Sequence, residues 1–438
     1  MSSTMATLDK IVALCKRRGF VYQSAEIYSG LNGVYDFGPL GTQLRANIKQ
    51  AWLTNMTRWP EEVLVMDGSI LGSSSVWEAS GHLANFSDPM VDCLNCKKRF
   101  RADDPDINLE KSCPSCGVKK WTDVRQFQLM FETNLGALSE NASKAYLRPE
   151  TAQAIFINFK NVYSSNRIKI PFGIAQIGKA FRNEITPKQF LFRMREFEQM
   201  EMEFFCKGEH ADKFFELWVE RRKKFYDEVG LNSEKVRLRP HAADELAHYS
   251  KACVDVEYNF PFGWKELEGI ANRSNYDLSQ HSKFSGKELA VFDEETKTSY
   301  VPHVVESSVG VDRLFLTLLF DAYVEDVVEG ETRVMLKLHP KMAPVTAAIM
   351  PLTNKLKEQA HLVYQDLKKR GYRIQFDESG SIGKRYRRQD EIGTPVCFTY
   401  DFDTLEDNKV TARNRDTCAQ ERVSLNKLPE YLDSLLGK

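Results

Sequence analysis

The sequence has neither of the glycine-rich loops that most often hold phosphate groups. No GxxxxGK[ST] and no strand-anchored GxGxxG pattern occurs in it, so a bound nucleotide would have to be held by arginine side chains and Mg²⁺. Apolar runs of membrane-spanning length, internal repeats and low-complexity segments are also lacking. The first residues contain only the short apolar run IVALC near Asp9, which predicts neither a secretory signal nor a transit peptide. We therefore expect a globular protein with no membrane partner.

Neither sign of charge dominates the chain. It has 60 Lys and Arg against 61 Asp and Glu, a formal net charge of −1. No overall basic field indicates a nucleic-acid partner, although a local basic patch would be enough to bind one. The nine cysteines are an odd number for a disulfide framework, and four of them stand in close pairs. This cysteine usage is typical of a cytoplasmic protein.

The paired cysteines have the spacing of a zinc site. Cys93-x2-Cys96 is followed, after sixteen residues, by Cys113-x2-Cys116. Two such pairs can hold opposite sides of a tetrahedral ion, and four thiolates favour a closed structural site over a catalytic one. The alternatives are four unrelated free thiols, or a purely structural zinc protein, which would leave the patterns described below unexplained.

The stretch FRNEITPKQFLFRMREFEQMEMEFF (181–205) is predicted as two strands joined by a short turn at Pro187. Successive strand residues face opposite ways, so Met200, Met202 and Phe204 would form an apolar face. The opposite face carries Phe197 and several carboxylates. One interpretation is an exposed hairpin with solvated ion pairs. The other is the base of a ligand-binding site, in which arginine binds an anion, Phe197 stacks against a flat group and the carboxylates hold a cation.

Two further segments place charge at the start of a helix. YLRPETAQAIF (146–156) brings Arg148 and Glu150 just before a helix that Thr151 could begin, which is also what an ordinary helix start looks like. ESSVGVDRLFLTLL (306–319) reads as a strand, a glycine turn and an apolar helix, and glycine there would let a ligand approach the backbone. Neither segment decides a function by itself.

The pattern of predicted helices and strands changes near residues 325–336. Before it, helical and strand-like runs mix with aromatic and polar stretches; after it, strands and helices alternate compactly, as in KMAPVTAAIMPL, TNKLKEQAHLVYQDLKKRG and YRIQFDE. We predict an α+β fold with a first domain over 1–330 and a second, α/β domain over 335–438. Within the first domain we expect a cysteine-bearing insert at about 90–122 and an inserted helical or mixed region at about 208–265.

Taken together, the patterns resemble class II aminoacyl-tRNA synthetases. RNE (182–184), eight residues and RMREFEQME (193–201) fit the second signature of that class, and GVDR (310–313) fits the third. Shorter matches, YDFGPLG, RPETAQ, WKELEGIANR, ESSVG and RYRRQDEIGTP, are similar to the homodimeric type of glycyl-tRNA synthetase, over essentially the whole chain. One departure is the stretch VLVMDGSILGSSSVW, which lacks the proline that the class usually carries in its first signature, although Pro60 lies upstream.

The resemblance implies a central antiparallel sheet flanked by helices, and an ATP site upon it. Arg182 would hold the α-phosphate, Arg193 the outer phosphates, and Phe197 and Arg313 would enclose the adenine; Arg182, Glu184 and Arg313 would be the catalytic residues. Glu266 and Glu306 would lie near Mg²⁺–ATP. The implied ATP-binding residues are Arg182, Asn183, Glu184, Phe192, Arg193, Met194, Arg195, Glu196, Phe197, Glu266, Leu267, Gly310, Val311, Asp312 and Arg313.

The resemblance also implies a glycine pocket. Glu150, Glu201 and Ser308 would bind the amino group, and a wall made of Glu201 and the backbone of residues 307–308 would exclude any side chain. The implied glycine-binding residues are Arg101, Glu150, Phe197, Glu198, Gln199, Met200, Glu201, Glu306, Ser307, Ser308, Val309 and Gly310. The activity expected is activation of glycine with ATP, which gives glycyl-adenylate and pyrophosphate, followed by transfer of glycine to the 3′-terminal adenosine of tRNA(Gly).

The second domain resembles the anticodon-binding domain of several class II synthetases. Arg385, Arg387 and Arg388 would contact tRNA, with Tyr386 among them; a solvated run of charge is the alternative. The implied partners are tRNA(Gly), glycine, ATP and a second copy of the chain, with Mg²⁺ and a structural Zn²⁺. Two other functions stay open at this point: a catalytically silent relative that binds RNA or a polymerase, and a class II synthetase for serine, threonine or proline.

Overall fold

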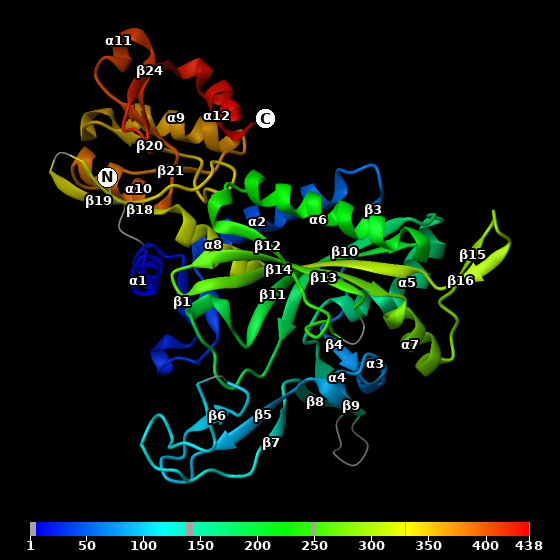
Figure 1. The fold of residues 1–438 in the computed structure, drawn as a ribbon. Coiled ribbons are helices and arrows are strands. Elements are labelled where there is room, and N and C mark those ends of the chain that lie inside the picture. Colours follow the sequence, from blue (N-terminus) through cyan, green and yellow to red (C-terminus); the bar gives the residue numbers. More distant parts are fainter. Residues whose placement is uncertain (1–5, 105, 137–142, 248–249, 329, 438) are drawn as a thin grey trace.

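A computed structural model describes residues 6–104, 106–136, 143–247, 250–328 and 330–437 of the chain. Its largest sheet has seven strands in the order β12-β13-β14-β17-β11-β10-β3 (Figure 1). The neighbours in this sheet run antiparallel, except that β3 is parallel to β10. The strands are β3 (Val63–Val65), β10 (Phe172–Phe181), β11 (Glu196–Cys206), β12 (Val236–Pro240), β13 (Ala252–Phe260), β14 (Gly263–Ser274) and β17 (His303–Gly310).

Helices cover both faces of this sheet. On one face lie α2 (Pro39–Thr57), α6 (Ala211–Glu228) and α8 (Val311–Ala322), which bury the main apolar core against the strands. On the other face, α5 (Ala152–Asn166) and α7 (Tyr276–Ser285) cover one end through a second apolar cluster. The rest of that face is left for polar side chains. The sequence-predicted antiparallel sheet flanked by helices is therefore present.

The predicted hairpin exists, but the connection between its strands is not a short turn. Phe181 pairs with Glu196 at the end of the ladder, and residues 182–195 form a long loop with a 3₁₀ turn at Phe190–Phe192. Arg182 and Glu184 thus follow the first strand rather than alternating along it. The apolar face is confirmed, since Met200, Met202 and Phe204 are fully buried. The carboxylates on the other face are buried too, so solvated ion pairs do not describe them.

The region expected as an insert at about 208–265 supplies α6 and the outer strands β12 and β13 of the main sheet. The cysteine-bearing segment is built differently. It forms an arm below the sheet in Figure 1, with β5 (Ser87–Asp92), β6 (Arg99–Arg101) and β7 (Arg125–Gln128). A neighbouring small sheet contains β4 (Leu71–Ser73), β8 (Phe131–Leu135) and β9 (Ser143–Leu147). Next to these lie α3 (Ser74–Ala79) and α4 (His82–Asn85).

The C-terminal part is an α/β body with its own core. Its sheet has the order β21-β20-β22-β23-β24, formed by Ile374–Phe376, Ala347–Pro351, Val396–Tyr400, Lys409–Asn414 and Gln420–Ser424. The helices are α9 (Lys357–Lys369), α10 (Ile382–Ile392), α11 (Thr404–Asp407) and α12 (Leu428–Leu436). The predicted boundary is an ordered hairpin of β18 (Tyr323–Val328) and β19 (Glu331–Leu336), where buried Arg333 pairs with Asp326 and, at 3.4 Å, with Asp390 of α10.

The remaining elements are short or peripheral: α1 (Leu8–Arg18), β1 (Val21–Gln23), β2 (Tyr35–Phe37), β15 (Val291–Asp293) and β16 (Thr298–Tyr300). Helix α1 begins where the Thr7 hydroxyl accepts a hydrogen bond from the backbone N–H of Lys10, and it ends at Gly19, whose φ of 75° is left-handed. Among the described residues, no helix is both long and apolar enough to cross a lipid bilayer.

Candidate active site

A cavity opens on the polar face of the main sheet, where β11 and β17 meet the long loop 182–195. Its floor is the beginning of β11 and the end of β17, and its rim comes from that loop, the start of α8 and β14. The residues that line it are Arg182, Glu184, Leu191, Phe192, Arg193, Met194, Phe197, Glu198, Gln199, Glu266, Ser308, Gly310, Asp312 and Arg313. The two synthetase-like signatures, more than 100 residues apart in sequence, therefore converge on one cavity.

Arg182 is held in this cavity by residues outside its own loop. Its Nε donates a hydrogen bond to the carbonyl oxygen of Pro149 at 3.1 Å. The guanidinium carbon lies 5.3 Å from the centre of the Phe197 ring and 5.4 Å from that of Phe86. These are cation–π distances, so the positive charge is held over an aromatic face rather than by a carboxylate. The charge stays available for an anion.

Arg313 and Arg193 lie at the open end of the cavity. Arg313 donates to the backbone oxygen of Glu266 at 2.8 Å and lies 3.2 Å from its carboxylate, with the guanidinium 4.5 Å from the centre of the Phe192 ring. The Glu266 side chain is 53% exposed. Arg193, 42% exposed, is 4.0 Å from the carboxylate of Glu184. Long, exposed charged side chains of this kind can rearrange when a ligand arrives.

Several predicted ATP-site residues have side chains that are engaged in other contacts of the fold. Glu196 pairs with Lys179, and Arg195 donates to backbone oxygens of Glu184, at 2.9 Å, and of Asn32, at 2.6 Å. Asp312 is buried, accepts the backbone N–H of Glu198 at 2.8 Å and pairs with Arg45 at 3.1 Å. The side chains of Met194, Leu267 and Val311 from this set, and those of Met200 and Val309 from the predicted glycine-binding set, are buried in the apolar core.

Beyond Ser308 and Gln199 of the cavity lining lies a buried carboxylate cluster centred on Glu201, which we call the closed end. One Glu201 oxygen accepts both the backbone N–H of Thr151, at 2.8 Å, and the Thr151 hydroxyl; the other accepts Ser308 Oγ at 2.7 Å and Gln199 Nε2 at 3.1 Å. Burial raises the pKa of Glu201, the charge of Glu150 raises it further, and the hydrogen bonds from Thr151 and Ser308 lower it. Glu201 is thus oriented before any substrate binds.

Glu150 lies close enough to Glu201 for its charge to act on it, and it has partners of its own. Burial opposes its ionisation, but His82, whose Nε2 lies 3.3 Å away, together with Arg273 holds the pKa of the Glu150 carboxyl well below its usual range. Gln153 Nε2 also donates to it at 3.0 Å. Glu150 is therefore ionised at neutral pH.

Glu306 flanks Glu201 on the opposite side, on β17. Its carboxylate accepts a hydrogen bond from Arg273 Nη1 at 2.6 Å, and Arg273 also binds Asp277 through two nitrogens, at 2.8 and 2.9 Å. Burial raises the pKa of Glu306 to about 7, although Arg273 acts in the opposite direction. The sequence analysis missed Arg273, Asp277 and His82; Arg273 closes the quoted run WKELEGIANR, which was the available signal.

The neighbouring serines of β17 face opposite sides of the sheet. Ser308 points to Glu201, whereas the Ser307 hydroxyl donates to Glu268 at 2.5 Å on the α6 side, where Arg222 also pairs with Glu268 at 2.7 Å. The Glu198 side chain likewise points to α2, at 2.7 Å from Arg45 and 3.1 Å from Lys49. Ser307 and Glu198, which both belong to the predicted glycine-binding set, can therefore line the pocket only through their backbone.

Arg101 lies outside the cavity lining. It stands at the end of β6 on the cysteine arm and pairs with Asp88 at 3.1 Å and Asp103 at 2.8 Å. The hydrogen bond to Asp103 raises the pKa of Arg101 against the effect of burial, and the charges of Asp88, Asp103 and Glu184 raise it further. The arm therefore approaches the active-site loop without placing Arg101 in the cavity.

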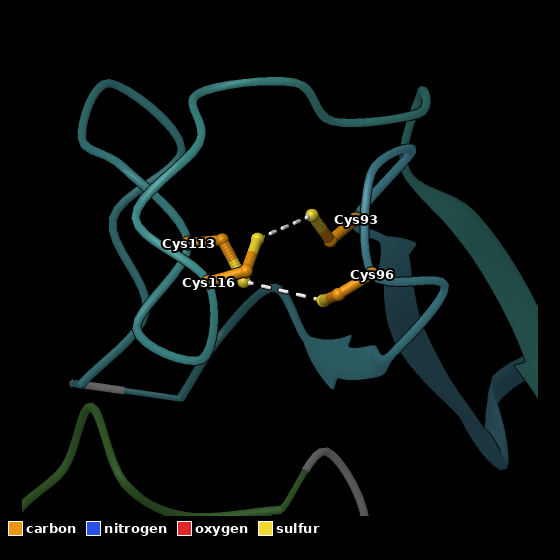
Figure 2. A group of neighbouring side chains, drawn as sticks. All are labelled: Cys93, Cys96, Cys113 and Cys116. Carbon is orange, nitrogen blue, oxygen red and sulfur yellow. Dashed lines mark hydrogen bonds between the residues drawn. The ribbon is translucent and has the colours of Figure 1, made fainter.

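The four predicted zinc ligands come together at the end of the arm (Figure 2). The Sγ atoms of Cys93 and Cys116 are 3.6 Å apart, those of Cys96 and Cys113 are 3.8 Å apart, and all four lie within 4.8 Å of one another. Tetrahedral Zn²⁺ with Zn–S bonds of about 2.3 Å places its sulfurs about 3.8 Å apart. Residues Lys97 and Gly117, with φ of 59° and 71°, turn the chain behind each pair.

The basic run of the C-terminal body forms helix α10, and its arginines differ in exposure. Arg385 is buried and donates to the carbonyl oxygens of Gly380, at 3.0 Å, and Pro351, at 2.6 Å. Arg388 makes a two-pronged pair with Asp377, at 3.0 and 2.6 Å. Arg387 lies 3.9 Å from Asp390 and is partly exposed. Arg385 thus holds the fold together, while Arg387 and Arg388 reach the surface.

Comparison with known proteins agrees with this site. Residues 130–323 match the tRNA synthetase class II core domain (G, H, P, S and T), and residues 346–435 match the anticodon binding domain. Over nearly their full lengths, curated relatives are similar to the chain. A glycine–tRNA ligase of Caldanaerobacter subterraneus subsp. tengcongensis is 51% identical over 98% of both chains. Those of Treponema denticola and Borrelia hermsii are each 50% identical over 98% of this chain and 97% of their own.

Proposed function

The chain belongs to the glycine–tRNA ligase family, and we propose on that basis that it activates glycine with ATP and charges tRNA(Gly). The first step gives glycyl-adenylate and pyrophosphate, and the second transfers the glycyl group to the 3′-terminal adenosine. The observation that carries this proposal is the closed end, where Glu201 accepts a hydrogen bond from Ser308 and the charges of Glu150 and Glu201 act on their neighbours. Such a carboxylate cluster suits the ammonium group of glycine, and we assign the exclusion of side chains to its walls.

Activation needs charge neutralisation and positioning rather than a general base, because the attacking glycine carboxylate is already ionised. We assign Arg182 to the α-phosphate and Arg193 to the outer phosphates. Phe197 and Arg313 would hold the adenine, with Phe192 supporting Arg313 from behind. Glu184 would lie beside the adenine amino group or the incoming tRNA end. When bound with ATP, Mg²⁺ would neutralise phosphate charge, and Glu266 at the open end is the carboxylate placed to meet it.

For glycine, we assign Glu150, Glu201 and Glu306 to the ammonium group, with Ser308 fixing Glu201. The backbone of residues 307–308 would form the wall that excludes side chains. Glu306 already has a cationic partner in Arg273, and His82 Nε2 lies 3.3 Å from Glu150, which lowers the cost of burying several negative charges together. The arriving ammonium would add a further positive charge.

We propose that the cysteine arm binds a structural Zn²⁺ through Cys93, Cys96, Cys113 and Cys116. The sulfur spacings and the all-thiolate donor set support this assignment. Purified protein should contain one equivalent of zinc by mass spectrometry, and Cys96→Ser should lose it together with protection of the arm from protease. Cys253→Ser, outside the cluster, is the control. Full zinc retention by Cys96→Ser would contradict the assignment.

We propose a division into a catalytic domain over 1–330 and an anticodon-binding domain over 335–438, a homodimer, and a cytoplasmic location. In the second domain, Arg387 and Arg388 are the surface candidates for RNA, and a loss of one phosphate contact would reduce the salt dependence of binding. The overall test is charging of a tRNA(Gly) transcript with labelled glycine, alongside the Arg387→Ala variant. Loss of charging with unchanged tRNA-independent activation would support the tRNA role of α10. Equal charging of a tRNA(Ser) transcript would contradict the proposed specificity.

A further inference from the structure

One buried carboxyl beside the glycine pocket has no role in the function proposed above. Glu203 lies on β11, two residues beyond Glu201 and on the same face of the strand. Its side chain is fully buried, and within the described part of the chain neither of its oxygens has a hydrogen-bond partner. A buried polar group without a partner destabilises a fold, so its presence needs a physical reason.

Glu203 occupies the border between two environments. Across the ladder it pairs directly with Glu306 on β17 and, on its other side, with Ile174 on β10. Directly opposed residues of antiparallel strands have Cβ atoms about 4.5–5.5 Å apart. Ile174 belongs to the apolar cluster under α5 and α7. One flank of Glu203 is thus hydrocarbon, and the other is a carboxylate of the glycine pocket.

The positive charge near Glu203 is already shared by other carboxylates, so it does not offset an additional negative charge on Glu203. Arg273 is already engaged by Asp277 and Glu306. Burial raises the pKa of Glu203 well above its usual range, and the charge of Glu306 raises it further. Full burial, an apolar flank at Ile174 and the lack of a partner among the described residues all favour the neutral acid, which has an O–H donor. The titratable and charged groups that face this region from the surrounding elements are Glu201, Glu306, Arg273, Asp277, His281, Glu150 and His82.

We propose that Glu203 is a positioning residue of the glycine pocket: its neutral carboxyl donates a hydrogen bond to the Glu306 carboxylate when glycine is bound. Arg273 holds one Glu306 oxygen from β14, and Glu203 would hold the group from β11. Rotation of side chains that already face each other is all the contact requires. Glu306 would then keep its lone pairs aimed at the ammonium group. The inference deepens the proposed function and rests on it.

The test separates donation from packing with two substitutions of similar size. Glu203→Met has no donor and should raise the KM for glycine about tenfold, the usual worth of one charge-assisted hydrogen bond. Glu203→Gln keeps an N–H donor and should restore a KM within about threefold of the wild type. The KM for ATP and kcat should change little in either variant. The Met variant should unfold at the same or a higher temperature, since an apolar chain suits the dry site.

Ile174→Leu, on the opposite flank, is the packing control, because it conserves volume and carries no donor. A Met variant with the wild-type KM for glycine would overturn the proposal, and so would equal losses in Met and Gln. If the Glu203→Met variant does not fold, the Glu203→Gln variant provides the test. Its KM for glycine should follow that of the wild type from about pH 6 to about pH 8.5, because a neutral Glu203 would stay protonated over this range. Divergence at the alkaline end would overturn the proposal.

The proposed function itself is checked in the same assay. Wild-type protein must show glycine-dependent ATP–pyrophosphate exchange, and Glu201→Gln must weaken it. If both hold and Glu203→Met behaves as wild type, only the role of Glu203 fails. If glycine gives no exchange at all, the glycine pocket fails, and the role of Glu203 fails with it.

Discussion

The two ends of the active-site cavity are built in opposite ways. At the closed end, Glu201 receives hydrogen bonds from Thr151 and Ser308, and Glu306 is held by Arg273, all within the buried sheet. At the open end, Arg193 and Glu266 are largely exposed and make few fixed contacts. A substrate with no side chain has little surface to offer, so the protein must pre-arrange the groups that recognise it. ATP brings enough charge and ring surface to order its own partners.

The largest effect should come from Arg182, which links the two ends. Arg182→Ala removes the cation assigned to the α-phosphate, where charge develops during attack, and should lower kcat/KM for ATP–pyrophosphate exchange by about a thousandfold. The KM for glycine should change little, because no interaction among the described residues joins Arg182 to Glu150, Glu201 or Glu306. Arg99→Ala, which removes a surface pair with Asp92 on the arm, is the control. Near-normal exchange would refute the assignment.

Next in size is the loss of charge at the closed end. Glu201→Gln keeps the shape but removes the negative charge from the centre of the pocket, and should raise the KM for glycine about a hundredfold. The KM for ATP should stay within about twofold. Steady-state exchange kinetics with each substrate varied in turn measure both constants. An equal rise in both would mean that the two ends are not independent.

The closed end should also show a pH effect that the open end lacks. Burial raises the pKa of Glu306 to about 7, so its charge is present above that pH and is lost as the pH falls through it. The KM for glycine should therefore rise about tenfold from about pH 8 to about pH 6. The KM for ATP is the internal reference. A glycine KM that is flat over this range would show that Glu306 stays ionised or does not contact glycine.

The smallest effect is expected for an exposed side chain. Glu266→Gln removes an ion pair with Arg313 that lies 3.2 Å away, but the guanidinium keeps its bond to the Glu266 backbone oxygen. Exposed pairs contribute little, so the KM for ATP should change only about two- to fivefold. Raising the Mg²⁺ concentration should recover part of the loss. A change as large as that in Arg182→Ala would show that the open end is as pre-arranged as the closed end.

Patterns of residue type and spacing predicted the parts of this architecture that depend on local chemistry. The cysteine pairs, the apolar face of Met200, Met202 and Phe204, and the strand–helix alternation after the hairpin are all present. Signature positions such as Arg182 and Arg313 also converge on one cavity.

What the sequence could not predict depends on partners far away in the chain. Strand alternation does not reveal that loop 182–195 leaves the ladder after Phe181, nor that Ser307 and Ser308 serve opposite faces of the sheet. The basic run predicted an RNA contact for Arg385, yet the register of α10 buries it against the carbonyl oxygens of Gly380 and of Pro351, at the end of β20. Arg273 and Glu203 acquire meaning only once β11, β14 and β17 are adjacent.

The most direct test of this account is amino-acid-dependent ATP–pyrophosphate exchange without tRNA, run separately with each proteinogenic amino acid. The account predicts exchange with glycine alone, because Glu150, Glu201 and Glu306 are proposed to hold the ammonium group and the backbone of residues 307–308 to exclude a side chain. Exchange with alanine or serine at a comparable rate would contradict it, since the pocket would then accept the substituents that its walls are proposed to exclude.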